Sequence, residues 1–281
     1  MVQIITDSAA DFEPHEYEEM CVKCVPLCVS FGDKEYHENV YLSKELFYQL
    51  LEQSKDFPRT AQPSPYTVES ILQEIMDAED ETVIITLSSG FSGFYQNVLM
   101  VKNMLKYKNC YVIDSKTGTG GLRLLVEQAV KLRDAGKNAR EITEAIEALR
   151  SRIILYACMD TLEYLHRGGR ISSTVYTVGS VVHIKPILQI STEGDVEIPA
   201  KVMGMSKGMD FVCKKLRQYV RDEDYPLYVM FTGNRTNGEI LAQRLRDQGY
   251  AIPDERIINV GAAIGSHIGP KACGIVYIAK E

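Results

Sequence analysis

Short apolar runs alternate along the chain with segments of helical periodicity, a pattern typical of a parallel α/β sheet. Strands are expected at residues 2–6, 82–87, 110–113 and 227–231, and three of the four lead through a turn into an amphipathic helix. Polar residues stand where the strands end. Because ligands of open α/β sheets bind beyond the carboxyl ends of the strands, we expect these side chains to gather at one edge. They are Asp7, Ser8, Ser88, Ser89, Asp114 and Ser115.

Helical spacing and capping residues predict four helices in the first half of the chain. They cover residues 65–76 after Ser64, 93–105 after Ser92, 121–132 and 139–150. In the second half, helical segments are expected at 160–166, ending at Gly168 and Gly169, and at 173–182.

Residues 186–190 and 196–202 bracket a short Gly-containing turn at 193–195 and predict a β-hairpin. A hairpin indicates a mixed sheet in a second domain. We therefore expect an α/β protein of two domains, residues 1–155 and 156–281, with the boundary near Leu155.

Composition narrows the classes of function. The chain has 281 residues, 45% of them hydrophobic, and a net charge of -7. This charge argues against nucleic-acid binding, which depends on clustered positive charge. The chain contains no apolar run long enough to span a membrane and no N-terminal signal pattern, so a cytoplasmic location is expected. Its seven cysteines are then expected to be free and mostly buried.

Cys21, Cys24 and Cys28 include a C-x-x-C pattern, and His15 and His37 are available as further metal ligands. The spacing matches no paired zinc signature. Residues 22–29 instead alternate like one strand, which Pro26 would place at a sheet edge. Buried, inert thiols are the favoured interpretation, and no metal or cofactor is expected.

Two glycine motifs allow alternatives. Ser206 lies in a literal G-x-S-x-G at 204–208, and His267 downstream could complete a serine-hydrolase triad. The preceding residues 197–202 hold two charges and a proline, unlike the buried strand before a nucleophile elbow. Residues 118–121 (GTGG) could cradle a phosphate, but Arg123 stands where the dinucleotide fingerprint needs its third glycine, and a tight strand-to-helix turn is favoured.

Thr60 and Ser92 each lie at or just before an expected helix N-terminus. Such hydroxyls are commonly only helix caps. Two of them beside two helix N-termini would also form a neutral site for a carboxylate or phosphate, held by backbone N–H groups and helix dipoles.

Seven stretches together resemble the DegV family of bacterial fatty-acid-binding proteins, the lipid-carrying subunits of fatty acid kinase. In order along the chain they are ITDSAAD (5–11), TAQPS (60–64), LSSGFSGFYQ (87–96), VIDS (112–115), DTLEYLHRGGRIS (160–172), IKPIL (184–188) and IGSHIGP (264–270). Each stretch alone is weak, but their shared order covers nearly the whole chain.

The resemblance implies two α/β domains with a long-chain fatty acid in an apolar pocket between them. It places Thr60 and Ser92 on the carboxylate, with His267 and Arg170 beside it. It also implies that the chain has no catalysis of its own, and that a separate ATP-dependent kinase subunit phosphorylates the bound acid to an acyl phosphate for phospholipid synthesis. Lys271, Met203 and Met205 depart from the family pattern. We expect these departures to affect the kinase partner or its docking rather than the lipid site.

Overall fold

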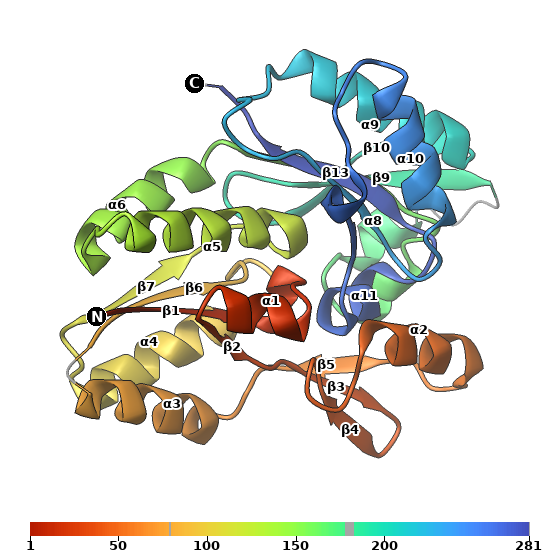
Figure 1. Ribbon diagram of the computed structural model, residues 1–281. Coiled ribbons are helices and arrows are strands. Elements are labelled where there is room, and N and C mark those ends of the chain that lie inside the picture. The colour runs from red at the N-terminus through yellow and green to blue at the C-terminus, as the bar shows by residue number, and fades with distance from the viewer. Residues whose placement is uncertain (79, 178–182, 281) are drawn as a thin grey trace.

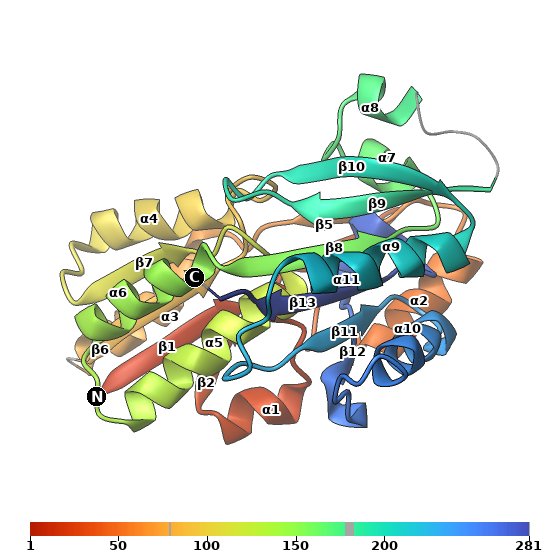
Figure 2. The same ribbon diagram turned by 90° about the horizontal axis from the view of Figure 1, so that it is seen from above.

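The computed structural model describes residues 1–78, 80–177 and 183–280 and contains three sheets (Figure 1). The first is a parallel sheet of β2 (Val22–Val25), β1 (Val2–Asp7), β6 (Glu81–Thr86) and β7 (Cys110–Asp114). The second, mixed sheet runs in the order β10 (Val196–Met203), β9 (Ile184–Ile190), β8 (Ile153–Cys158), β13 (Cys273–Ile278), β11 (Tyr228–Phe231) and β12 (Ile257–Asn259), as Figure 2 shows. A small antiparallel sheet holds β4 (Lys34–His37), β3 (Cys28–Phe31) and β5 (Arg59–Ala61). The predicted α/β class, with a parallel sheet followed by a mixed one, is confirmed.

Helices separate and cover the two large sheets. The helices are α1 (Pro14–Glu19), α2 (Lys44–Gln53), α3 (Pro65–Asp77), α4 (Phe94–Leu105), α5 (Thr119–Asp134), α6 (Ala139–Arg150), α7 (Glu163–Arg167), α8 (Ser173–Thr177), α9 (Met205–Gln218), α10 (Thr236–Arg246) and α11 (Ala262–Ile268), with 3-10 turns at Ser8–Ala10 and Asp254–Arg256. Helices α3 and α4 lie on one face of the parallel sheet and α5 and α6 on the other, while α9 and α10 cover the outer face of the mixed sheet (Figure 1). No helix among the described residues combines the length and hydrophobicity needed to cross a bilayer.

Local sequence signals explain several elements. The parallel strands are buried on both faces, so Ile4, Ile5 and residues 83–85 form continuous apolar runs. Ser64 caps α3 by accepting a hydrogen bond from the Thr67 backbone N–H at 3.1 Å, as its position predicts. Helix α6 spans the predicted residues and buries one apolar stripe. The hairpin of β9 and β10 also forms as expected.

Helix α5 lies between the two large sheets and contacts β1 and β6 on one side and β8 and β13 on the other. Its first eight residues are all buried, as expected for a helix enclosed on several sides. A Cβ atom added to Gly120 would come within 2.6 Å of Val276 Cγ1 and 3.1 Å of Met230 Sδ. Gly120 therefore allows close packing of α5 against the second sheet, in addition to the strand-to-helix turn that the glycines at 118–121 form.

Several expectations about element boundaries are wrong. Residues 22–29 form two strands in different sheets, because Pro26 and Leu27 redirect the chain between β2 and β3. Helix α7 starts later than residue 160, and α8 covers the start of the segment expected at 173–182, of which residues 178–182 lie outside the described part. The division into two domains near Leu155 stays a prediction; Leu155 itself lies in β8, a strand of the mixed sheet.

The cysteines of the described residues are all free, as expected, but Cys21 is exposed rather than buried. It has a positive φ of 49° in the turn between α1 and β2. The turn conformation places this residue outside the core.

The polar residues predicted at the carboxyl ends of the parallel strands do lie at one edge of the sheet. Their main hydrogen-bond partners there are backbone groups of the loops. Asp7 accepts hydrogen bonds from the backbone N–H groups of Ala9 and Leu87, and Asp114 accepts from that of Ser89. The Ser88 hydroxyl donates to the Gly194 carbonyl at 2.8 Å and so ties the β9–β10 turn to the parallel sheet. This cluster fixes loops and does not line the main cavity.

Two buried carboxylates from the N-terminal half hold the start of α11. Asp11 Oδ1 accepts a hydrogen bond from the Gly261 N–H at 2.8 Å, and Glu38 Oε1 accepts one from the Ala263 N–H at 3.2 Å. These bonds satisfy backbone donors that a helix leaves free at its N-terminus. Burial raises the pKa of Asp11 to about 7 against the opposing charge of Lys44, and burial also raises the pKa of Glu38.

The raised pKa of Asp11 predicts a pH-dependent stability. Between about pH 4 and pH 7 the folded protein keeps a proton on Asp11 that the unfolded chain has released, so this group makes the free energy of unfolding fall as pH rises. Asp11→Asn removes the titration, retains an acceptor for Gly261, and tolerates the positive φ of 59° at this position. We expect the variant to lose less stability than the wild type between pH 4 and pH 7.

Urea unfolding followed by circular dichroism measures this difference, since the chain contains no tryptophan. Asp33→Asn, at an exposed position, is the matched control and should follow the wild-type profile. Parallel pH profiles for Asp11→Asn and the wild type would contradict the assignment.

Candidate functional site

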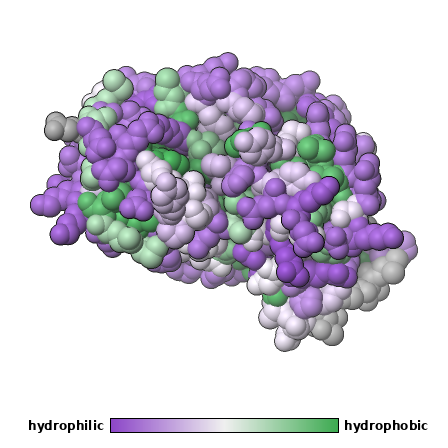
Figure 3. All heavy atoms as spheres, turned by 90° about the horizontal axis from the view of Figure 1, so that it is seen from below, coloured by the Kyte–Doolittle hydropathy of each residue, from purple (hydrophilic) through white to green (hydrophobic). Residues whose placement is uncertain are grey.

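A cavity of about 270 Å³ lies between the parallel and mixed sheets and is lined by residues from both halves of the chain. Its interior is apolar: Leu87, Leu155, Leu188, Met230 and Ile264 line it and are each at most 8% exposed. On the outer face seen in Figure 3, hydrophobic residues form only small separate groups on a mainly hydrophilic surface.

Several polar residues of the lining lie near one another, apart from the hydroxyls of Thr119 and Thr232, which contact Met230 and the Ala272 backbone. The four predicted site residues, Thr60, Ser92, Arg170 and His267, all line the cavity and are all partly buried. Ala61, Gln62 and Gly93 beside them are exposed. The cavity thus has a polar mouth and an apolar interior, the distribution that suits a molecule with one polar end.

Thr60 and His267 are in direct contact, with 2.7 Å between Thr60 Oγ1 and His267 Nε2. Both lie in elements that the sequence did not predict. Thr60 belongs to β5, where it pairs with Val29, rather than to a helix entry. His267 lies in the last turn of α11 rather than in a loop. The first turn of this helix is held at Gly261 and Ala263, and the helix continues through His267 before it ends at Gly269.

His267 is held against glycine backbone. A Cβ atom on Gly168 would lie 2.1 Å from His267 Nδ1, so only glycine leaves room for the ring. His267 Nδ1 is buried without a hydrogen-bond partner among the described residues. A hydrogen on Nε2 makes His267 the donor to Thr60 and leaves the Thr60 hydroxyl hydrogen available to an acceptor in the cavity. Gly168 is a site residue that sequence reasoning treated only as a helix stop.

Electrostatics at the mouth favour an anion. Burial, reinforced by the positive charge of Arg170, lowers the pKa of His267 to about 3, so the ring is neutral at pH 7. Arg170 donates to the carbonyls of Phe91 at 3.1 Å and Gly168 at 2.5 Å. Within the described residues Arg170 forms no ion pair. Its burial disfavours the charged guanidinium and lowers its pKa. A partly buried cation without a carboxylate partner is costly unless an anion joins it.

Ser92 lies at the start of α4, where its hydroxyl accepts a hydrogen bond from the Phe94 N–H at 3.2 Å. Gly93, not Ser92, occupies the N-cap position, and α4 begins one residue later than expected. The N-terminus of α3, at Ser64 and Pro65, does not line the cavity. The hypothesis of two helix N-termini around one anion is therefore wrong, and only that of α4 lies at the mouth.

The serine-hydrolase alternative gains no support from the geometry. Ser206 is exposed on α9, where its hydroxyl accepts a hydrogen bond from Arg244 at 2.8 Å. The strand before it, β10, is antiparallel and lies at the edge of the mixed sheet. A nucleophile elbow needs a strand-to-helix turn above a parallel sheet, and His267 contacts Thr60 instead of Ser206.

Comparisons with known proteins agree with this architecture. A family model described as "Uncharacterised protein, DegV family" matches residues 1–280. DegV domain-containing proteins of Caldanaerobacter subterraneus and Clostridium acetobutylicum are 30% and 31% identical, and the matches cover 99% of this chain and 99% of each relative. The chain therefore belongs to the DegV family.

Solved structures share the fold over the full length. A fatty-acid-binding DegV family protein from Thermus thermophilus is 24% identical, with a TM-score of 0.88 and coverage of 99% of both chains. A stearic-acid-binding protein from Eubacterium ventriosum is also 24% identical, with a TM-score of 0.88 and coverage of 100% of this chain and 99% of that one.

The environment of His267 predicts an unusual titration. In the ligand-free protein, the chemical shift of the His267 Cε1 proton should stay constant from pH 5 to pH 8, because burial keeps the ring neutral throughout. A histidine in an unfolded chain titrates near 6.5. The signal can be assigned by its loss in His267→Gln. A midpoint near 6.5 would show that the ring is solvated in solution.

Proposed function

We propose that this DegV family protein binds a long-chain fatty acid, with the acyl chain in the apolar cavity and the carboxylate at its polar mouth. The observation that carries the proposal is Arg170, a partly buried cation that has no carboxylate partner among the described residues and lies beside an apolar cavity. Thr60, Ser92 and His267 surround the same end. The fatty-acid-binding relatives from Thermus thermophilus and Eubacterium ventriosum support this assignment.

The energetics favour such a ligand. Each buried CH₂ group contributes roughly 0.8 kcal/mol, so a chain of about 16 carbons offers on the order of 10 kcal/mol before the costs of association. The carboxylate loses its hydration on entry and needs hydrogen bonds and a compensating charge. The hydroxyl of Thr60 and the guanidinium of Arg170 supply both. Hydroxyl groups also hold an anion less tightly than a bidentate arginine clamp does, which suits a carboxylate that must react.

We further propose that the chain acts as a carrier that presents the carboxylate to a separate ATP-dependent kinase subunit in the cytoplasm. The sequence lacks the glycine-rich P-loop motif that binds nucleotide phosphates. The polar end of the cavity lies next to exposed residues, where a second protein could reach the carboxylate. Lys271 and Met203 are exposed and do not line the cavity, so their departures from the family pattern bear on that partner rather than on the lipid.

The double variant Thr60→Ala/Ser92→Ala tests the anion site. It removes two hydrogen bonds to a charged group, each worth roughly 1.5–3 kcal/mol, so affinity for palmitate should fall at least tenfold in a calorimetric titration. The matched control is Ser70→Ala/Thr143→Ala, whose hydroxyls donate only to carbonyls within their own helices. Equal affinity in the wild type and the Thr60/Ser92 variant would refute the placement of the carboxylate.

A second experiment distinguishes a role of His267 in lipid binding from a role in phosphorylation of the bound lipid. His267→Ala should weaken fatty-acid binding only modestly, by about the 1 kcal/mol of a typical hydrogen bond. It should reduce kinase-dependent acyl-phosphate formation at least tenfold more, because His267 orients the Thr60 hydroxyl as a donor. A preorganised donor contributes roughly 3 kcal/mol when negative charge develops in the transition state.

Lipid titration and acyl-phosphate assays at saturating lipid are made on the same protein, with this chain alone and the kinase subunit alone as blanks. His267→Gln retains an N–H donor and should recover part of the turnover. Equal losses in binding and turnover would make His267 a binding residue only, and product formed by this chain alone would refute the carrier role.

A further inference from the structure

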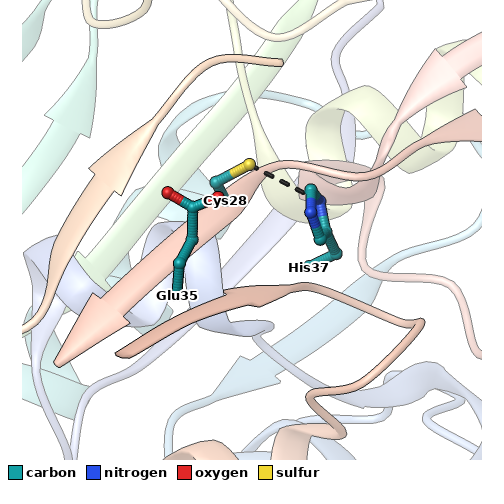
Figure 4. A group of neighbouring side chains, drawn as sticks. All are labelled: Cys28, Glu35 and His37. Atoms are coloured by element: carbon teal, nitrogen blue, oxygen red, sulfur yellow. Dashed lines mark hydrogen bonds between the residues drawn. The ribbon is translucent and has the colours of Figure 1, made fainter. Parts of the chain in front are cut away.

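A cluster of three different metal-ligating side chains lies on the β3–β4 hairpin, apart from the lipid cavity. Cys28 on β3 pairs directly with His37 on β4. Glu35 lies two residues before His37 and therefore points to the same face of the hairpin. Cys28 Sγ lies 3.5 Å from His37 Nδ1, and the three ligand atoms all lie within 4.8 Å of one another. Figure 4 shows the side chains converging on one side of the hairpin.

The spacing suits tetrahedral zinc. With Zn–S near 2.3 Å and Zn–N near 2.05 Å, tetrahedral angles place sulfur and nitrogen about 3.5 Å apart. The distance between Cys28 Sγ and His37 Nδ1 already has this value. Glu35 is exposed, so its carboxylate can move by the remaining ångström or so without disturbing the core.

These groups have no competing structural role among the described residues. Glu35 forms no ion pair or side-chain hydrogen bond there, and the only polar contact of the His37 ring is with Cys28. Cys28 is buried and not in a disulfide. Ser30 on β3 pairs with Glu35 on β4 and with Arg59 on β5, so strand β3 separates Arg59 from Glu35. Arg59 and Glu35 form no ion pair.

We propose that Cys28 Sγ, His37 Nδ1 and the Glu35 carboxylate bind one Zn²⁺ ion, with water as the fourth ligand. Thiolate and imidazole select Zn²⁺ over Mg²⁺ and Ca²⁺, which prefer all-oxygen ligands. The ion would join the two strands of the hairpin. It would also brace β3 next to Val29, which pairs with Thr60 at the lipid mouth on the adjacent strand.

Metal titration of the chelator-treated, reduced full-length protein tests the site. We expect one equivalent of Zn²⁺ to bind in calorimetry, and Co²⁺ to give a sulfur-to-cobalt charge-transfer band with tetrahedral d–d absorption that Zn²⁺ abolishes. Cys28→Ser and His37→Ala should each weaken Zn²⁺ binding by at least about 100-fold. Loss of a residue that only hydrogen-bonds to a metal ligand already costs up to about 100-fold in affinity, and loss of the ligand itself should cost at least as much. Cys21→Ser and His15→Ala, at exposed positions outside the cluster, should leave it unchanged.

Glu35→Gln provides an independent check, since this exposed position can change without risk to the fold. It should weaken Zn²⁺ binding measurably while circular dichroism stays that of the wild type. Absence of the charge-transfer band, or the same band and affinity in Cys28→Ser, would overturn the proposal. Loss of the band in Cys21→Ser instead would assign the metal to another cysteine and would also overturn it.

Discussion

Capping of α11 by two buried carboxylates is the interaction on which the site depends. Asp11 and Glu38 belong to the N-terminal half, yet they accept hydrogen bonds from the first backbone N–H groups of a helix in the C-terminal half. The carboxylates also lie at the positive end of the helix dipole. The Ser8 hydroxyl and the Lys44 ammonium complete this buried network, through Glu38 and the Asp11 carbonyl respectively. Because α11 is only seven residues long, fixing its first turn also fixes His267 in its last.

The polar mouth keeps features that a protein selected for stability alone would avoid. Arg170 lacks a carboxylate partner among the described residues, and His267 Nδ1 is buried without a hydrogen bond. The adjoining cavity also forgoes packing contacts, a loss that destabilises a folded core. Elsewhere the buried acids, such as Asp7 and Asp114, accept backbone hydrogen bonds. The unpaired charge of Arg170 and the open cavity beside it are demands that an anionic ligand would satisfy.

Much of the fold follows from local sequence. The buried parallel strands, the capped helix α6 and the β9–β10 hairpin have signals within a few residues of one another. Thr60 and Ser92 were candidates for an anion site from their local positions, whereas Arg170 and His267 were placed beside the same anion only through motif resemblance, since no local pattern brings the four together. The secondary structure predicted for Thr60 and His267 is wrong because residues far away in the sequence determine it. Thr60 belongs to a strand that pairs with Val29, and Asp11 and Glu38 cap the helix that holds His267. The Cys28–His37 pair depends on the register of the β3–β4 hairpin, and the sequence predicted the start of β3 as part of one strand with β2.

The contact between Thr60 and His267 joins residues 207 positions apart in the chain. Neither half alone contains both partners, and neither sheet alone encloses the cavity. A folding intermediate with one ordered half would therefore have no ligand site, however native its secondary structure. Long-range contacts of this kind form late, since closing a long loop costs entropy before any contact is gained. A ligand of this cavity would therefore bind only after the two halves have docked, and its binding would stabilise the docked fold over such partial structures.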